Sequence, residues 1–155
     1  MKVWRIYDKS LTPEQAISGW GAFTWGGRWN SEGVYVVYVS EHLSLAAFEK
    51  LVHLEDEVAL RTTYLKLSIN VPDELIGTYP LEHLPKGWQS LVDNTDTQAI
   101  GDNWLKDPEG PLALQVPSVV VPEENNLLLN PKHPDWKKLT ISDPSDFSYD
   151  PRLSG

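Results

Sequence analysis

Short apolar segments with strand periodicity alternate along the chain with segments whose apolar residues recur at helical spacing. Runs of β-branched and aromatic residues bounded by turn formers predict strands at residues 3–7, 34–39, 65–69, 112–122, 126–130 and 139–141. Capping signatures and helical spacing predict helices that begin at residue 13 and that cover residues 41–54 and 96–106. Strands interleaved with short helices and long loops predict an α+β fold with a mixed or antiparallel sheet.

Two of the predicted strands bear on a functional site. Residues 34–39 are apolar at nearly every position, which is typical of a central strand that is buried on both faces. The run 112–122 contains Pro117, which cannot donate to a strand ladder and therefore marks an edge or a bulge. Ser118 follows at this irregularity, and the pattern alone allows either a structural or a functional serine there.

A glycine-rich segment with a central arginine precedes the predicted central strand. Five of the ten glycines lie between residues 19 and 33, so the backbone here can adopt positive φ and approach a ligand closely. Arg28 stands in this segment between Trp25 and Trp29, and its planar fork of donors suits phosphate or carboxylate. The segment therefore predicts an anion-binding loop, with a glycine-rich turn whose arginine points into water as the alternative.

The predicted helix 41–54 places Glu49 at the edge of its apolar stripe. In one interpretation Glu49 is a solvated side chain, and in another the helix brings it to the rim of a cleft beside the glycine-rich loop. A metal site formed by His42, Glu49 and His53 is a third interpretation. Glu49 and His53 share a helix face, but His42 lies nearly two turns away, so the sequence predicts no metal site.

Composition narrows the class of protein. The length of 155 residues with 41% hydrophobic residues predicts one domain over residues 1–155, and the absence of cysteine excludes disulfides and a thiolate nucleophile. The net charge of −9 opposes non-specific binding to nucleic acid or an anionic membrane. Without a signal-like or membrane-spanning run, a cytoplasmic protein is expected. The chain also lacks a GxGxxG fingerprint and a P-loop, so any nucleotide is bound in another way.

Several motifs together resemble the RES-domain proteins, a family named for an arginine, a glutamate and a serine. The matching segments are residues 27–30, 36–38, 46–53, 116–118 and 125–134. They occur in the family's order, and the resemblance extends over nearly the whole chain. The resemblance implies a fold like that of ADP-ribosyltransferases. It also implies that the chain is the toxin of a bacterial toxin–antitoxin pair, whose antitoxin carries an Xre-like helix-turn-helix.

The resemblance implies an activity that consumes NAD⁺ by cleaving the nicotinamide–ribose bond. Phosphate is then a co-substrate if the reaction is phosphorolysis, whereas hydrolysis uses water, and no further cofactor is expected. Transfer of ADP-ribose to a macromolecular target is an alternative that uses the same site. A non-catalytic module that only binds a partner is the alternative from a different class.

Motif by motif, the resemblance identifies Arg28, Tyr38, Glu49 and Ser118 as the principal site residues, with Arg5 and Asn126 in matching segments that also contact the substrate. Glu49 is expected to stabilise the oxocarbenium-like transition state. Arg28 is expected to hold the pyrophosphate, Tyr38 to pack against nicotinamide, and Ser118 to orient Arg28 or the ribose. The antitoxin is expected to reach the Arg28 loop with a carboxylate or a chain terminus.

Overall fold

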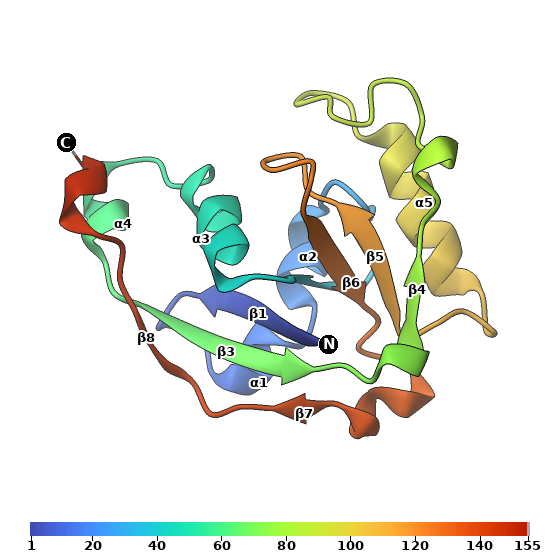
Figure 1. The fold of residues 1–155 in the computed structure, drawn as a ribbon, viewed down its shortest axis with the longest axis horizontal. Helices are drawn as coiled ribbons and strands as arrows, with labels where there is room; N and C mark the ends of the chain where they lie inside the picture. The colour runs from blue at the N-terminus through green and yellow to red at the C-terminus, as the bar shows by residue number, and fades with distance from the viewer. Residues whose placement is uncertain (155) are drawn as a thin grey trace.

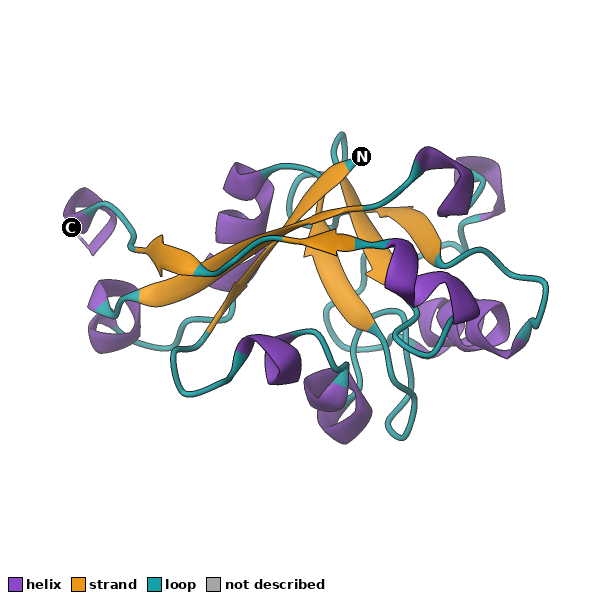
Figure 2. Cartoon of the chain, turned by 90° about the horizontal axis from the view of Figure 1, so that it is seen from below, coloured by secondary structure: helices purple, strands orange, loops and turns teal. Residues whose placement is uncertain are grey.

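The computed structural model describes residues 1–154, which form one curled sheet of eight strands with short helices on both of its faces (Figures 1 and 2). The strand order is β4-β5-β6-β2-β1-β3-β7, and β8 pairs with β3 as well. Every pairing is antiparallel except that of β4 with β5. The strands are β1 (Lys2–Tyr7), β2 (Val37–Ser40), β3 (Tyr64–Asn70), β4 (Ile76–Thr78), β5 (Ala113–Pro117), β6 (Asn125–Leu129), β7 (Thr140–Ile141) and β8 (Ser145–Phe147). The expected α+β fold with a mixed sheet is confirmed.

The helices are short and lie mostly between strands. They are α1 (Pro13–Ala16), α2 (Trp20–Trp25), α3 (Leu43–Leu51), α4 (Glu57–Arg61) and α5 (Thr95–Lys106), with single 3₁₀ turns η1 (Asp73–Leu75), η2 (Leu81–His83), η3 (Pro134–Lys138) and η4 (Pro151–Ser154). The helix α3 packs against β1 and β2. No helix within residues 1–154 is both long enough and apolar enough to cross a membrane.

The alternation of side chains along the strands divides the core between the two faces of the sheet. On β6, Leu127 and Leu129 belong to the main buried cluster, whereas Leu128 between them packs on the opposite face against the side chains of α5. A third cluster, which includes Ile6 and Ala46, fills the space between β1, β3 and α3. Both faces are therefore covered, which explains why the central strands are apolar at nearly every position.

The junction between β1 and β2 is the weakest pairing of the central sheet. Residue for residue, β1 pairs with β3 along its whole length, but only Trp4 and Ser40 are paired between β1 and β2. Arg5 reaches the main chain beside this divergence, where its side chain donates to the carbonyl oxygens of Ala16 and Tyr38. The bond from the guanidinium to the Tyr38 carbonyl takes the place of a backbone hydrogen bond that a continuous β1–β2 ladder would make.

The structure shifts some predicted boundaries. The central strand begins at Val37 rather than at residue 34, and α3 begins after His42 rather than after Ser40, which belongs to β2. The run predicted to continue to residue 122 ends at Pro117, which pairs with β6 but lies beyond the last residue paired with β4. Pro117 therefore stands at a local edge, as its missing donor requires.

Candidate active site

A cleft of about 730 Å³ opens beside the divergence of β1 and β2. Its walls come from those two strands, from the glycine-rich loop 26–29, from α3 and from residues 117–120. Arg5, Arg28, Tyr38, Glu49 and Asn126 all line it. The volume falls within the range of pockets that enclose cofactor-sized ligands.

The Glu49 carboxylate is held from one side by two donors. Its Oε1 accepts from the Ser118 hydroxyl and from the Asn126 side-chain amide, each at 2.6 Å. The three residues come from α3, from the segment after β5 and from β6. No hydrogen bond from residues 1–154 reaches Oε2, so the half-buried carboxylate keeps one oxygen for a ligand.

Ser118 differs from its expected role. Its side chain is 0% exposed, it does not line the cleft, and its hydroxyl donates to Glu49 rather than to Arg28 or toward a ribose. The same oxygen accepts from the backbone N–H groups of Val120 and Val121 at 3.0 and 3.1 Å, which closes a tight turn after the proline. Ser118 therefore holds the Glu49 carboxylate from behind the cleft wall.

Ser40, which no sequence pattern indicates as a site residue, extends the hydrogen-bonded chain by one more residue. Its hydroxyl donates to Oδ1 of Asn126 at 2.7 Å, and the register of β2 with β6 places these two residues opposite each other. This bond fixes which end of the Asn126 amide faces Glu49. The residues are 86 positions apart, so only a correct prediction of strand pairing could have found the contact.

Tyr38 makes two hydrogen bonds that fix the conformation of the glycine-rich loop around Arg28. The Tyr38 hydroxyl donates to the Asn30 side chain at 2.7 Å and accepts from the Trp29 N–H at 3.0 Å. A Cβ on Gly27 would lie 2.6 Å from this hydroxyl, so the close approach requires glycine. Burial is the largest influence on Tyr38 and raises its pKa well above the usual tyrosine value. The neutral hydroxyl is therefore engaged in hydrogen bonds to the loop segment, while Tyr38 also lines the cleft.

Within residues 1–154, the Arg28 guanidinium makes its hydrogen bonds through one terminal nitrogen. One terminal nitrogen donates to the carbonyl oxygens of Trp88 and Ser90, both at 2.8 Å. Within residues 1–154 no carboxylate lies within 4.0 Å of this guanidinium. Burial lowers the pKa of Arg28, and the negative charge of Glu49 partly offsets that shift. The other donors of the fork remain for an anion.

Arg5 and Lys50 add positive charge along the strands and α3. Burial lowers the pKa of Arg5 to about 10, although it still leaves the side chain charged at neutral pH. Burial also lowers the pKa of Lys50, whose ammonium lies 4.6 Å from the centre of the Tyr64 ring. Lys50 was not identified from the sequence, where it could not be distinguished from a solvated lysine.

The charges on the cleft wall contrast with the charge of the whole chain. Among the lysine, arginine and carboxylate side chains of residues 1–154, three cations line the cleft and Glu49 is the only acidic residue that does, although the net charge of the chain is −9. Trp25 and Leu91 stand at the cleft with 80% and 85% of their surface exposed. Such a cleft favours a ligand that is anionic and also carries flat apolar groups.

A family model described as the RES domain matches residues 2–150. The chain belongs to the RES-domain family. A relative named "Toxin Res" from Yersinia enterocolitica serotype O:8 / biotype 1B is 41% identical over 137 residues, or 88% of this chain and 89% of the relative. A "Prs ADP-ribosylating toxin" from Sphingobium sp. (strain YBL2) is 39% identical over 154 residues, or 97% and 94% of the two chains.

Among solved structures, the crystal structure of the M. tuberculosis MbcT–MbcA toxin–antitoxin complex contains a similar chain. It aligns with a TM-score of 0.75 at 20% identity, over 99% of this RES-domain chain and 86% of that one. At this identity the likeness establishes the fold. Within the RES-domain fold, the expected glutamate and serine are hydrogen-bonded to each other, and the expected arginine lines the same cleft from the glycine-rich loop.

Proposed function

We propose that this RES-domain chain is the toxin of a toxin–antitoxin pair and that it degrades NAD⁺ by cleaving the nicotinamide–ribose bond. The observation that carries the proposal is the single carboxylate, Glu49, held by Ser118 and Asn126 in a cleft whose other charged groups are cations. The relatives that share the family are named as toxins, and one of them as an ADP-ribosylating toxin.

The reaction breaks the bond between the anomeric carbon of the ribose and the ring nitrogen of nicotinamide. The electron pair of that bond leaves with nicotinamide, which departs as a neutral base and needs no acid. Positive charge develops on the ribose, and Oε2 of Glu49 is the oxygen available to stabilise it or to accept from a ribose hydroxyl. In phosphorolysis an oxygen of hydrogen phosphate then bonds to the anomeric carbon. In hydrolysis water bonds there and releases one proton to the solvent.

Binding of the rest of NAD⁺ follows from the charges and surfaces of the cleft. The pyrophosphate carries two negative charges, and the free donors of Arg28 suit its oxygens. The Tyr38 ring is the proposed contact for nicotinamide. Arg5 and Asn126 complete the polar lining near Glu49. Such positioning contributes to the rate because it holds the ribose where the carboxylate acts.

The products of incubation with NAD⁺ test the proposal. Purified protein is mixed with NAD⁺ with and without phosphate, and the products are identified by mass spectrometry. We expect free nicotinamide in both the phosphorolytic and the hydrolytic case, with ADP-ribose phosphate marking the former and ADP-ribose the latter. Intact NAD⁺ under both conditions, with folded protein, would remove the proposal.

Transfer of ADP-ribose to a macromolecule is the second candidate, and the relative named "Prs ADP-ribosylating toxin" favours it. Nicotinamide release uses the same cleft and the same Glu49, and only the acceptor differs. An adduct on a defined protein that forms faster than NAD⁺ is lost without that protein would favour transfer. Growth inhibition that survives Glu49→Gln would instead indicate a non-catalytic module.

A further inference from the structure

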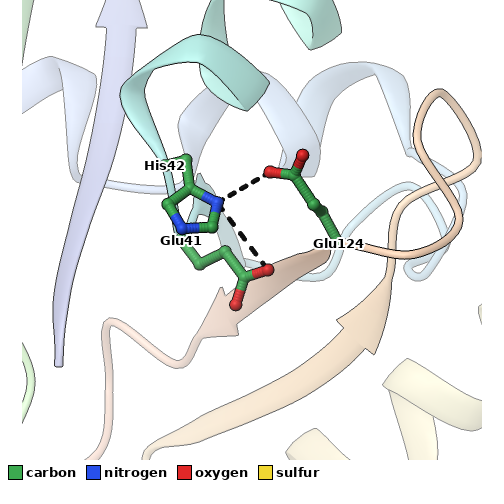
Figure 3. A group of neighbouring side chains, drawn as sticks. All are labelled: Glu41, His42 and Glu124. Carbon is green, nitrogen blue, oxygen red and sulfur yellow. Dashed lines mark hydrogen bonds and ion pairs between the residues drawn. The ribbon is translucent and has the colours of Figure 1, made fainter.

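Three side chains outside the cleft converge where β2 passes into α3. His42 Nδ1 lies 2.7 Å from Oε1 of Glu124 and 3.9 Å from Oε1 of Glu41, with the imidazole beside both carboxylates (Figure 3). The three ligand atoms lie within 4.8 Å of one another. Within residues 1–154, this is the one group of three or more such side chains that could hold a metal ion. His42 therefore does not face Glu49 or His53, the partners considered from the sequence.

The fold positions these residues before any ion binds. Glu41 and His42 link β2 to α3, while Glu124 immediately precedes β6. The backbone N–H of Asn125 donates to Oε1 of Glu41 at 2.8 Å, and the N–H of Glu41 donates to the Asn125 carbonyl at 3.2 Å. Outer hydrogen bonds of this kind orient metal ligands and maintain their spacing.

The charges of the cluster leave a deficit of positive charge. No lysine or arginine within residues 1–154 lies within 4.0 Å of Glu41 or Glu124; His42 is their only basic partner at that distance. With a neutral imidazole, the group carries two negative charges. A divalent cation would neutralise both carboxylates and use the Nδ1 lone pair, a function that a lysine or arginine cannot perform.

We propose that Glu41, His42 and Glu124 form a binding site for a divalent transition-metal ion such as Zn²⁺, with water in the fourth position. A tetrahedral ion with ligand bonds of about 2.0–2.1 Å separates its ligand atoms by about 3.3 Å. The distances from His42 Nδ1 to the two carboxylates, 2.7 and 3.9 Å, bracket that value, and all three ligand atoms lie within 4.8 Å of one another, so side-chain rotations would complete the geometry. An imidazole with two carboxylates selects a transition metal over Mg²⁺ or Ca²⁺.

The site would connect the two segments that carry the Glu49 assembly. His42 precedes the helix on which Glu49 lies, and Glu124 stands two residues before Asn126. An ion bound here holds the start of α3 to the start of β6, and it stabilises the folded chain through binding that the unfolded chain lacks. This inference does not depend on the reaction proposed for the cleft.

Titration with zinc tests the site. The full chain is freed of metal with EDTA, and ZnCl₂ is titrated in a non-chelating buffer by calorimetry, with MgCl₂ in parallel. We expect one Zn²⁺ per chain, weak or absent Mg²⁺ binding, and a higher melting temperature with zinc. The variants His42→Ala and Glu124→Gln should each weaken zinc binding at least tenfold, roughly the loss expected when a single ligand is removed.

His83→Ala is the matched control, because His83 is an exposed histidine outside the cluster. This variant should bind zinc as the parent does. Melting curves of all variants in EDTA establish that they are folded, and Glu124→Gln keeps the shape of the side chain if His42→Ala proves unstable. Absence of zinc binding in the parent, or equal affinity in the parent and Glu124→Gln, would overturn the proposal and leave His42 as an ion-pair partner only.

Discussion

Glu49 presents two different oxygens to its surroundings. Oε1 accepts two hydrogen bonds, from Ser118 and Asn126, while Oε2 receives none from residues 1–154. Because rotation of the carboxylate would break two bonds to a charged acceptor, Oε2 keeps one direction. This restraint distinguishes Glu49 from the solvated glutamate that the pattern of its helix also allowed.

Ser40 tests whether orientation of the Asn126 amide matters to the site. In Ser40→Ala the amide loses the partner of its Oδ1, so it can turn its oxygen toward Glu49 and repel it. We expect the rate of nicotinamide release at saturating NAD⁺ to fall roughly tenfold, the equivalent of about one hydrogen bond, with a smaller change in KM.

A double-mutant cycle with Asn126→Ala separates this role from general destabilisation. If Ser40 acts through Asn126, the double variant should be no slower than Asn126→Ala alone. Ser40→Thr keeps the hydroxyl and should retain part of the activity. Full activity in Ser40→Ala, or additive losses in the double variant, would contradict the role.

The glycine-rich loop 26–29 depends on the close approach of the Gly27 backbone to the Tyr38 hydroxyl. In Gly27→Ala the added Cβ would lie 2.6 Å from the Tyr38 hydroxyl and 2.9 Å from the Asn30 side-chain oxygen. We expect a loss of about 1–3 kcal/mol in the free energy of unfolding, measured by urea denaturation, together with lower activity.

Gly21→Ala is the matched substitution, because a Cβ there meets nothing within 4 Å and the residue lies inside α2. Alanine favours helix over glycine by up to about 1 kcal/mol, so this variant should be as stable as the parent or more stable. Equal effects of the two substitutions would show that the loop tolerates the extra atom.

A hydrogen bond from the ionisable Tyr149 hydroxyl joins the C-terminal segment to α3. The Tyr149 hydroxyl donates to the Ala47 carbonyl at 2.6 Å, and burial raises the pKa of Tyr149 to about 12. Since the unfolded tyrosine ionises near pH 10, its contribution to stability is complete below that pH and declines as pH rises through about 12.

Tyr149→Phe measures this contribution. The difference in unfolding free energy between parent and variant should be largest below pH 10 and should shrink toward pH 12. The comparison cancels the opposite influence of Arg5, whose lowered pKa makes the folded chain lose a proton first. A difference that does not change between pH 8 and pH 12 would contradict the assignment.

The elements that sequence reasoning identified are those with an extended periodic pattern. The strands β1, β3 and β6 and the helix α5 have strong local patterns and were located to within a few residues. The helix α2 was missed because glycines at positions 19 and 26, which adopt positive φ, flank a six-residue segment that resembles a loop. The strands β4 and β8 have three residues each and form only by pairing with longer strands.

The site was predictable to a similar degree. The family resemblance indicated Arg28, Glu49 and Ser118, but not that the serine would bond to the glutamate. Contacts such as that of Ser40 with Asn126 depend on strand register over 86 residues, for which a single sequence carries no direct signal. Lys50 was missed because a lysine on a helix is usually solvated.

The positive charge that lines the cleft contrasts with the net negative charge of the whole chain. The free donors of the Arg28 fork and the apolar neighbours of this residue provide an anchor for an inhibitory segment of a partner, and the related fold in the MbcT–MbcA crystal structure occurs in a toxin–antitoxin complex. We expect the cognate antitoxin to place a carboxylate or a chain terminus on Arg28, where it competes with the pyrophosphate.

Arg28→Ala should therefore weaken antitoxin binding and also abolish NAD⁺ loss. Calorimetry with purified antitoxin measures the first effect, and Arg61→Ala on α4 is the control, because Arg61 is exposed and does not line the cleft. If Arg28→Ala loses activity but binds antitoxin as tightly as the parent, inhibition acts elsewhere on the surface.

Glu49 is expected to stabilise the positive charge that develops on the ribose as the nicotinamide–ribose bond breaks. The most direct measurement is the initial rate of nicotinamide release from saturating NAD⁺ by the parent and by Glu49→Gln, with Glu82→Gln as an exposed control outside the cleft. We expect Glu49→Gln to remain folded but to release nicotinamide at least a hundredfold more slowly, as loss of one transition-state charge contact implies, while Glu82→Gln should match the parent. Nicotinamide release by Glu49→Gln at the parent's rate would show that Glu49 does not have this role.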